Sequence, residues 1–384
     1  MIQAPVGGFV AAGFEPVQEA FAANFERHGE VGAACCVHLH GRMVVDLWGG
    51  VTTPGGSDPY IADTLQMVWS TTKGVTAIAA HILAQEGKLE FDAPVVEYWP
   101  EFAAEGKERI PVRWLFSHKA GLAAIDRRLG LDDVIAWTPV VDALAAQRPL
   151  WEPGSAHGYH TFTYGWLAGE VIRRVSGGTV GEFVAERIAG PLHADFWIGL
   201  PEAQNPRVAP VIPAPPPAPG EQLDPLTLRL LDPTTLAHKS FTNPVIPPAA
   251  FNEYAFRGAE VPAGNGIGSA RALSRIYAAC IGEVDGVRLL DAGTVQRATV
   301  TQARGEDLVM PYETHYGTGF QLSFPFRPMA GETSFGHYGS GGSVGFADKS
   351  LGISFGYVMN QMRPAYGLDP RTSGLVDALL SCLR

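Results

Sequence analysis

The sequence predicts an α/β protein of the α+β type, in which both ends of the chain form one antiparallel sheet flanked by helices, with a mostly helical domain inserted between them. Residues 31–50 consist of two β-type runs joined by a short turn, which is a hairpin pattern. Strand-like runs return from about residue 316. Between about residues 70 and 200 the apolar residues recur with helical spacing instead. The simplest arrangement therefore joins the strands of the two ends in a single sheet.

Each expected helix carries an apolar stripe of helical spacing and an end signal. Residues 14–30 form an amphipathic pattern closed by Gly29. A second stripe begins at Val75, within a helix that starts at or near Ser70 and ends before Gly87. Further helices are expected from Tyr164 to Gly177 and over residues 369–384, and further strands within residues 316–324, 333–339 and 351–360.

The length of 384 residues favours two domains. We expect a sheet domain made of residues 1–75 plus 262–384, and a mostly helical domain of residues 76–261. Residues 201–250 hold 13 of the 30 prolines. Proline at this density argues against a regular helix or a central strand, so we expect a surface loop that lines or covers a cleft.

Charge and composition exclude several function classes. Asp and Glu number 39 against 28 Lys and Arg, which gives a formal net charge of −11, and no basic run is present. Such a surface repels phosphate backbones, so we expect no nucleic-acid partner. No apolar run reaches the roughly 18–20 residues that span a bilayer, and residues 1–21 lack the positively charged start of a signal peptide. We therefore expect a cytoplasmic protein without a membrane span.

Neither cysteine nor histidine spacing indicates a metal site, and we expect no metal and no cofactor. The neighbouring thiols of Cys35 and Cys36 should point to opposite faces of a strand. His38 and His40 have no third ligand at metal spacing, so we expect them at the surface or at a sheet edge. The four cysteines, which we expect to be reduced and buried, are Cys35, Cys36, Cys280 and Cys382.

The pair Ser70 and Lys73 forms an S-x-x-K motif one helical turn long, so the hydroxyl and the amine can meet. A serine hydroxyl needs a base, and lysine can serve once desolvation or a positive potential lowers its pKa. The start of the helix also offers free N–H groups to an oxyanion. The alternative is that Ser70 caps an ordinary core helix and Lys73 is solvated.

Two further stretches could supply partners for this pair. Tyr159 lies in the loop before the helix that begins near Tyr164. A tyrosine there can relay a proton when a cation lowers its pKa, and packing beneath the loop is the alternative. The run "FGHYGSGGSVGF" (335–346) follows a strand pattern, and its glycines let the backbone approach a ligand closely.

Together and in this order, the three stretches resemble the serine β-lactamase and penicillin-recognising hydrolase superfamily. They are most similar to the family VIII carboxylesterases, which share a class C β-lactamase-like fold. The resemblance covers nearly the whole chain. It rests on "STTKGVTAIAAHILAQEGKLEFDAPVVEYWPEF", "IPVRWLFSHKAGL", "PLWEPGSAHGYHTFTYGWLAGEVI", "GNGIGSARALSRIYAA" and "GHYGSGGSVGFADKSLGISFGYVMN".

The resemblance implies that Ser70 is the acylated nucleophile and that Lys73 activates it. Tyr159 stands in the position of the family's Tyr-x-Asn motif and would share the acid and base roles with Lys73. Which of the two takes the first proton is left open. The oxyanion hole would use the backbone N–H groups of Ser70 and Ser340. The family's Lys-Thr-Gly motif would correspond to His337, Tyr338 and Gly339.

Two departures from the family pattern bear on the substrate. Thr161 stands where the family's Asn binds an amide, and a threonine hydroxyl cannot offer the paired donor and acceptor of an amide. His337 replaces a lysine, which removes a fixed cation, although an HxG motif also occurs in related peptidases. Both changes favour uncharged carboxylic esters over lactams and peptides. The further candidates for substrate contact are Trp69, Trp151, His160 and Tyr338, with core packing as the alternative for each aromatic residue.

Two other residues have competing interpretations. Ser343 lies in a G-x-S-x-G pattern, but a turn and a strand, not a helix, are expected to follow it, so we interpret it as part of a packed wall. His118 either forms a hydrogen bond in the wall of the site or ties down a loop.

The function predicted from the sequence is a serine carboxylesterase that hydrolyses small carboxylic esters through a Ser70 acyl-enzyme. Its partner would be a small-molecule ester substrate. The alternatives on the same scaffold are a β-lactamase, a D-Ala-D-Ala peptidase and an acyltransferase. A catalytically inactive binding protein is the alternative from another class.

Overall fold

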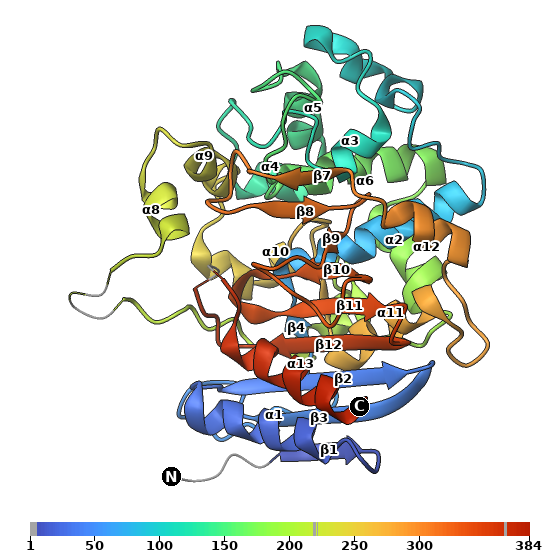
Figure 1. Cartoon of the computed structure of the whole chain (residues 1–384). Coiled ribbons are helices and arrows are strands. Elements are labelled where there is room, and N and C mark those ends of the chain that lie inside the picture. The colour runs from blue at the N-terminus through green and yellow to red at the C-terminus, as the bar shows by residue number, and fades with distance from the viewer. Residues whose placement is uncertain (1–5, 218–219, 221, 365–366) are drawn as a thin grey trace.

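Both ends of the chain contribute strands to one antiparallel sheet, as the sequence predicts (Figure 1). The structure is a computed structural model that describes residues 6–217, 220, 222–364 and 367–384. Within these residues the sheet has nine strands in the order β1-β3-β2-β12-β11-β10-β9-β8-β7. Their bounds are β1 (Val6–Val10), β2 (Gly32–Leu39), β3 (Arg42–Gly50), β7 (Ala303–Gly305), β8 (Thr314–Tyr316), β9 (Gln321–Leu322), β10 (Ser334–Tyr338), β11 (Val344–Asp348) and β12 (Ile353–Met359).

Strand β2 is an interior strand, and this placement decides the environment of its side chains. Cys35 packs in the apolar cluster on one face, and Cys36 in the larger core on the other, so the predicted opposite orientation is confirmed. The expectation that His38 lies at the surface or an edge is wrong. His38 is buried, because β3 and β12 pair with β2 on either side, and its Nδ1 lies 2.8 Å from the Ser274 hydroxyl. His40 lies beyond the end of the strand and is exposed.

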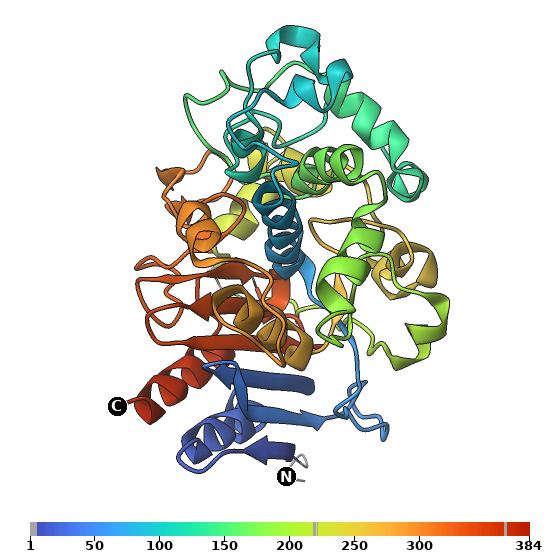
Figure 2. The ribbon, with the colours of Figure 1, turned by 90° about the vertical axis from the view of Figure 1, so that its right-hand side faces the viewer.

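Three helices cover the sheet at the end where the two chain termini lie. Helices α1 (Glu15–Arg27) and α13 (Pro370–Cys382) pack together on one face, and α11 (Ala270–Ile281) lies on the opposite face (Figures 1 and 2). The local sequence sets where α11 and α13 begin, because the side chains of Ser269 and Asp369 accept hydrogen bonds from the first turn of each helix.

Helix α2 (Thr72–Gln85) runs through the middle of the molecule (Figure 2). Its residues from Thr72 to Leu83 are all buried, so it is a helix buried all round, not the one-sided helix that its stripe suggested. It packs against α6 (Thr163–Ser176), which ends at Gly177 in the left-handed conformation (φ 79°). Outside residues 201–250, the remaining α-helices and strands are α3 (Val112–Phe116), α4 (Leu131–Ala136), α5 (Thr138–Ala146), α7 (Val180–Val184), α10 (Tyr254–Arg257), α12 (Ala292–Ala298), β4 (Gln66–Met67), β5 (Phe196–Trp197) and β6 (Ile267–Gly268).

The proline-rich stretch 201–250 contains two short helices, so the expectation of no regular helix there is wrong. They are α8 (Pro225–Leu231) and α9 (Leu236–Thr242). Most prolines of the stretch lie before and after these helices, and Pro225 occupies a first-turn position that needs no N–H donor. Residues 218, 219 and 221 of this stretch, and residues 1–5 of the N-terminal segment considered as a signal peptide, lie outside the described residues.

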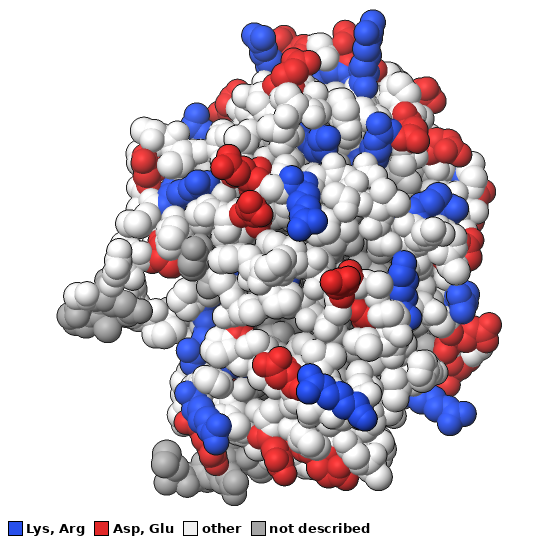
Figure 3. Space-filling view, in the orientation of Figure 1, with Lys and Arg blue, Asp and Glu red and all other residues white. Residues whose placement is uncertain are grey.

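One apolar core runs from the sheet into the helical part, through residues of α2, α6 and α11. The predicted domain boundaries at residues 75/76 and 261/262 stay a prediction. Among the described residues, no helix combines the length and the apolar character that crossing a membrane requires. The face seen in Figure 3 carries Lys, Arg, Asp and Glu side chains of both signs in a mixed distribution.

Candidate active site

Ser70 lies in a tight 3-10 turn, Trp69–Thr71, that leads into α2. Its hydroxyl does not cap the helix: the N-cap position of α2 is Thr71, so the simple capping alternative is wrong. Trp69, just before it, has a left-handed backbone (φ 51°), which a bulky residue adopts only when its surroundings hold it. The Trp69 ring packs edge-on against Phe251 at 4.8 Å between ring centroids, and its carbonyl accepts a hydrogen bond from Thr72. This turn leaves Ser70 half-buried at the wall of a cavity.

Lys73 is fully buried behind Ser70, so the interpretation of a solvated lysine is wrong. Its Nζ lies 3.1 Å from Ser70 Oγ and 2.8 Å from the Ala263 carbonyl oxygen. Within the part of the chain that the structure describes, no carboxylate forms an ion pair with Lys73. Burial holds the pKa of the amine well below its usual value. In its uncharged form, which burial favours, the amine can accept a proton from the Ser70 hydroxyl.

Tyr159 lines the same cavity, above the Lys73 amine, whose Nζ lies 4.9 Å from the centre of the tyrosine ring. Burial raises the pKa of the phenol, and a hydrogen bond with Ser70 opposes that rise. The loop that carries Tyr159 is held in place on the side away from the cavity, because the Tyr159 backbone N–H donates to the buried Asp307 carboxylate (3.0 Å). His118 packs beneath the ring and accepts a hydrogen bond from the His160 backbone N–H (3.1 Å). His118 therefore lies under the loop, outside the cavity lining.

The third motif lies at the end of β10 and in the turn that follows it. Tyr338, Gly339 and Ser340 line the cavity. The Tyr338 hydroxyl donates to the Pro328 carbonyl (2.8 Å), which holds its ring in the wall. His337 is buried with its Nδ1 2.7 Å from the Tyr338 carbonyl oxygen, and burial lowers the pKa of its imidazole. A neutral imidazole thus stands where the family has a lysine cation.

The cavity is small, about 50 Å³, and partly open to solvent, and five of its twelve lining residues are aromatic. Several of these residues belong to no sequence motif, because they come from loops and strand ends distant from the motifs. Arg327 adds a cation that sequence reasoning missed; its guanidinium lies 5.5 Å from the ring centre of Tyr312 and 5.3 Å from that of Tyr338. The lining residues are Ser70, Tyr159, Leu226, Phe241, Met310, Tyr312, Tyr316, Gln321, Arg327, Tyr338, Gly339 and Ser340.

Five residues predicted to contact substrate are not part of this lining: Trp69, Trp151, His160, Thr161 and His337. Trp69 packs into the core, and Trp151 donates its indole N–H to the Ala156 carbonyl at 3.3 Å. Both ring nitrogens of His160 are used inside the protein, at the Gly158 carbonyl and the Leu122 N–H. The Thr161 hydroxyl accepts a hydrogen bond from Ser240 Oγ of α9 (2.8 Å).

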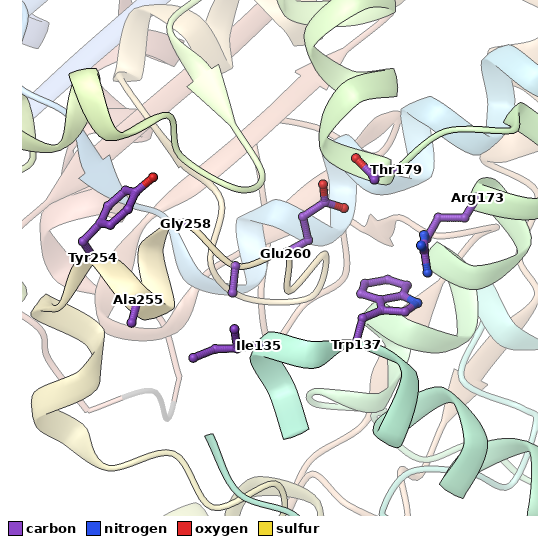
Figure 4. A pocket seen from close by; sticks show the side chains of 9 residues that line it. Ile135, Trp137, Arg173, Thr179, Tyr254, Ala255, Gly258 and Glu260 are labelled. Atoms are coloured by element: carbon purple, nitrogen blue, oxygen red, sulfur yellow. The ribbon is translucent and has the colours of Figure 1, made fainter. Parts of the chain in front are cut away.

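A second cavity lies between α4, α6 and α10, lined by Trp137, Arg173, Tyr254 and Glu260 among others (Figure 4). Its lining contains no serine, cysteine or lysine, so it offers no counterpart of the Ser70–Lys73 pair. Ser343 lines neither cavity: it is fully buried, and strand β11 follows it, as expected. Among the described residues, no three His, Cys, Asp or Glu side chains are grouped to hold a metal ion.

An antiparallel sheet, a buried central helix and a serine beside a buried lysine at the start of that helix define a β-lactamase-like hydrolase. The chain belongs to the beta-lactamase family, whose model matches residues 17–377. It is similar to the esterase/beta-lactamase LipL of Mycobacterium tuberculosis, with 36% identity over 357 residues, covering 91% of this chain and 81% of LipL. The resemblance deduced from the motifs is thereby confirmed.

Solved structures show the same fold over almost the whole chain. A family VIII carboxylesterase superposes with a TM-score of 0.89 and 36% identity, covering 98% of this chain and 100% of that structure. A penicillin-binding protein homologue from Caulobacter crescentus gives a TM-score of 0.88, also at 36% identity, with 98% and 100% covered. The names of these relatives refer both to a carboxylesterase and to a penicillin-binding protein, so family membership alone does not select between ester and lactam substrates.

Proposed function

We propose that the protein is a serine carboxylesterase that hydrolyses small carboxylic esters through an acyl-enzyme on Ser70. One observation carries the proposal: Ser70 Oγ, at the wall of an aromatic cavity, lies 3.1 Å from the amine of a fully buried lysine. Burial lowers the pKa of Lys73 well below its usual value, which favours the uncharged amine that acts as a base.

The reaction proceeds in two halves. Ser70 Oγ attacks the ester carbonyl carbon while its proton passes to Lys73 Nζ, since burial raises the pKa of Tyr159 and leaves the phenol protonated at rest. The N–H groups of Ser70 and Ser340 stabilise the negative oxygen of the tetrahedral intermediate. The carbon–oxygen bond to the alcohol then breaks, and the alcohol leaves with a proton delivered through Lys73 and Tyr159. Water attacks the acyl-enzyme by the same route and releases the carboxylic acid.

The choice of esters over lactams and peptides rests on Thr161. The Thr161 hydroxyl bonds to Ser240 and is absent from the cavity lining, so this position offers no amide-binding group to a substrate. Aromatic walls suit an apolar acyl or aryl group. The names of LipL and of the family VIII carboxylesterase agree with esterase activity.

A panel of p-nitrophenyl esters with varied acyl chains, measured beside nitrocefin, tests the proposal. We expect ester turnover that Ser70→Ala abolishes, and nitrocefin turnover far below it. Nitrocefin turnover equal to ester turnover would favour a β-lactamase, and product formed with an added alcohol would reveal an acyltransferase. A fluorophosphonate should label Ser70 stoichiometrically, whereas an inactive binding protein would not react.

A further inference from the structure

The two N–H groups of the proposed oxyanion hole belong to segments that are far apart in the sequence. Ser70 follows strand β4, and Ser340 follows strand β10. An oxyanion hole works only when both donors are held at fixed positions around the same oxygen atom. Something in the fold must therefore fix the spacing between these two turns.

Ser343 connects the two turns directly, although it is fully buried and cannot touch a substrate. Its Oγ donates a hydrogen bond to the Val68 carbonyl (2.7 Å), two residues before Ser70, and lies 3.2 Å from Thr71 Oγ1. Its own carbonyl accepts a hydrogen bond from the Gly339 N–H (2.7 Å), the residue just before Ser340. One residue thus binds both flanks of the proposed oxyanion hole.

The two turns pack tightly against each other at Gly339. A Cβ atom added to Gly339 would collide with Ser343 Oγ and with the Val68 carbonyl oxygen, and would lie 2.9 Å from Thr71 Oγ1. Only glycine fits at this point, so the two turns are in close contact around the Ser343 hydroxyl.

The far side of the turn is held by the start of α13. Gly341 (φ 82°) and Gly342 (φ 124°) have glycine-specific backbones, which do not fix a conformation by themselves. The buried Arg371 guanidinium donates to the Gly341 carbonyl (2.5 Å), and the Thr372 hydroxyl donates to the Gly342 carbonyl (3.1 Å). Glu30 and Asp369 hold the guanidinium at 3.0 and 2.7 Å.

We propose that Ser343 is a positioning residue that fixes the Ser340 N–H relative to Ser70, with Arg371 and Thr372 holding the turn from behind. The inference rests on the proposed function, because it assigns the Ser340 N–H to the oxyanion hole. A group that acts only on oxyanion geometry affects the transition state more than substrate binding. Its loss therefore lowers kcat and leaves KM almost unchanged.

Ser343→Ala tests this, with p-nitrophenyl butyrate as substrate and thermal unfolding measured in parallel. Complete loss of one oxyanion donor costs about 100- to 1,000-fold in kcat, so a displaced donor should cost about 10- to 50-fold. We expect this loss of kcat with KM changed less than about twofold. The matched control is Ser274→Ala, which removes an equally buried hydroxyl bonded to His38 and Ser354, none of them in the cavity lining.

The inference is overturned if Ser343→Ala keeps the wild-type kcat, or if Ser274→Ala lowers kcat equally. If Ser343→Ala does not fold, the Thr372→Val variant serves as the test instead. A fall in kcat at constant KM in this variant supports the inference, and an unchanged kcat overturns it. Ser70→Ala separates the two proposals. Activity retained in Ser70→Ala would refute the proposed function itself, whereas an inactive Ser70→Ala beside a fully active Ser343→Ala would refute only the positioning role.

Discussion

Replacing Lys73 by Met should change the stability of the protein in a pH-dependent way, because the lysine amine is buried without a counter-ion among the described residues. Burial lowers the pKa of Lys73 in the folded state, whereas in the unfolded chain the amine stays charged up to about pH 10.4. The unfolded state therefore binds one more proton than the folded state. At pH values between the folded and the unfolded pKa of Lys73, the free energy of unfolding of the wild type rises with pH, by about 1.4 kcal/mol per pH unit.

Methionine has a similar length and no proton to bind, so its variant lacks this dependence. Urea unfolding of both proteins at about pH 7.5 and about pH 9.5 isolates the effect, since other ionisable groups contribute equally to both. We expect the wild type to gain stability relative to Lys73→Met between the two pH values, by up to about 2.7 kcal/mol if the folded amine is uncharged over the whole range. Esterase activity of the variant should fall by about 100- to 10,000-fold. A stability difference that stays constant over this pH range would mean that Lys73 is charged in the folded state, and would refute its role as a neutral base.

Three further substitutions test neighbouring parts of the site. Tyr159→Phe should lower kcat for p-nitrophenyl butyrate by about 100-fold or more with little change in KM, because it removes only the hydroxyl that relays the proton. Asp307→Ala should lower the free energy of unfolding by about 3 kcal/mol, measured in urea, because the backbone N–H groups of Tyr159, Val309 and Met310 lose their shared acceptor. Phe241→Ala removes one wall of the cavity and should raise kcat/KM for bulky esters about tenfold relative to acetate, measured with the same ester panel.

Each of these has an outcome that would contradict it. A kcat loss in Tyr159→Phe matched by an equal rise in KM would indicate a binding role instead. Asp307→Ala with wild-type stability would show that the three N–H groups find other partners. An unchanged acyl preference in Phe241→Ala would mean that substrate does not reach α9.

The fold could be predicted from the sequence wherever local pattern and chain order agree. Strand-like runs at both ends and apolar stripes of helical spacing are local properties, and they led to the correct sheet and to α2, α6 and α13. The position of a strand within the sheet is not determined by the local sequence. His38 was misplaced because nothing in its neighbourhood shows that β2 lies between β3 and β12.

The candidate site could be predicted only as far as motifs extend. The structure brings Ser70 and Tyr159 to one cavity wall with Lys73 behind them. His160 and Thr161, the chain neighbours of Tyr159, bond inside the protein, because consecutive residues of a loop face different directions. Tyr312, Tyr316 and Arg327 were missed because they belong to no motif, and only the tertiary fold carries them to the cavity.

The central claim is that Ser70 carries the acyl group during turnover. Mass spectrometry of the protein quenched during hydrolysis of p-nitrophenyl butyrate tests it most directly. We expect a butyryl adduct on the peptide that contains Ser70, and no adduct in Ser70→Ala. An adduct on another residue such as Ser343, or wild-type turnover in Ser70→Ala, would contradict the account.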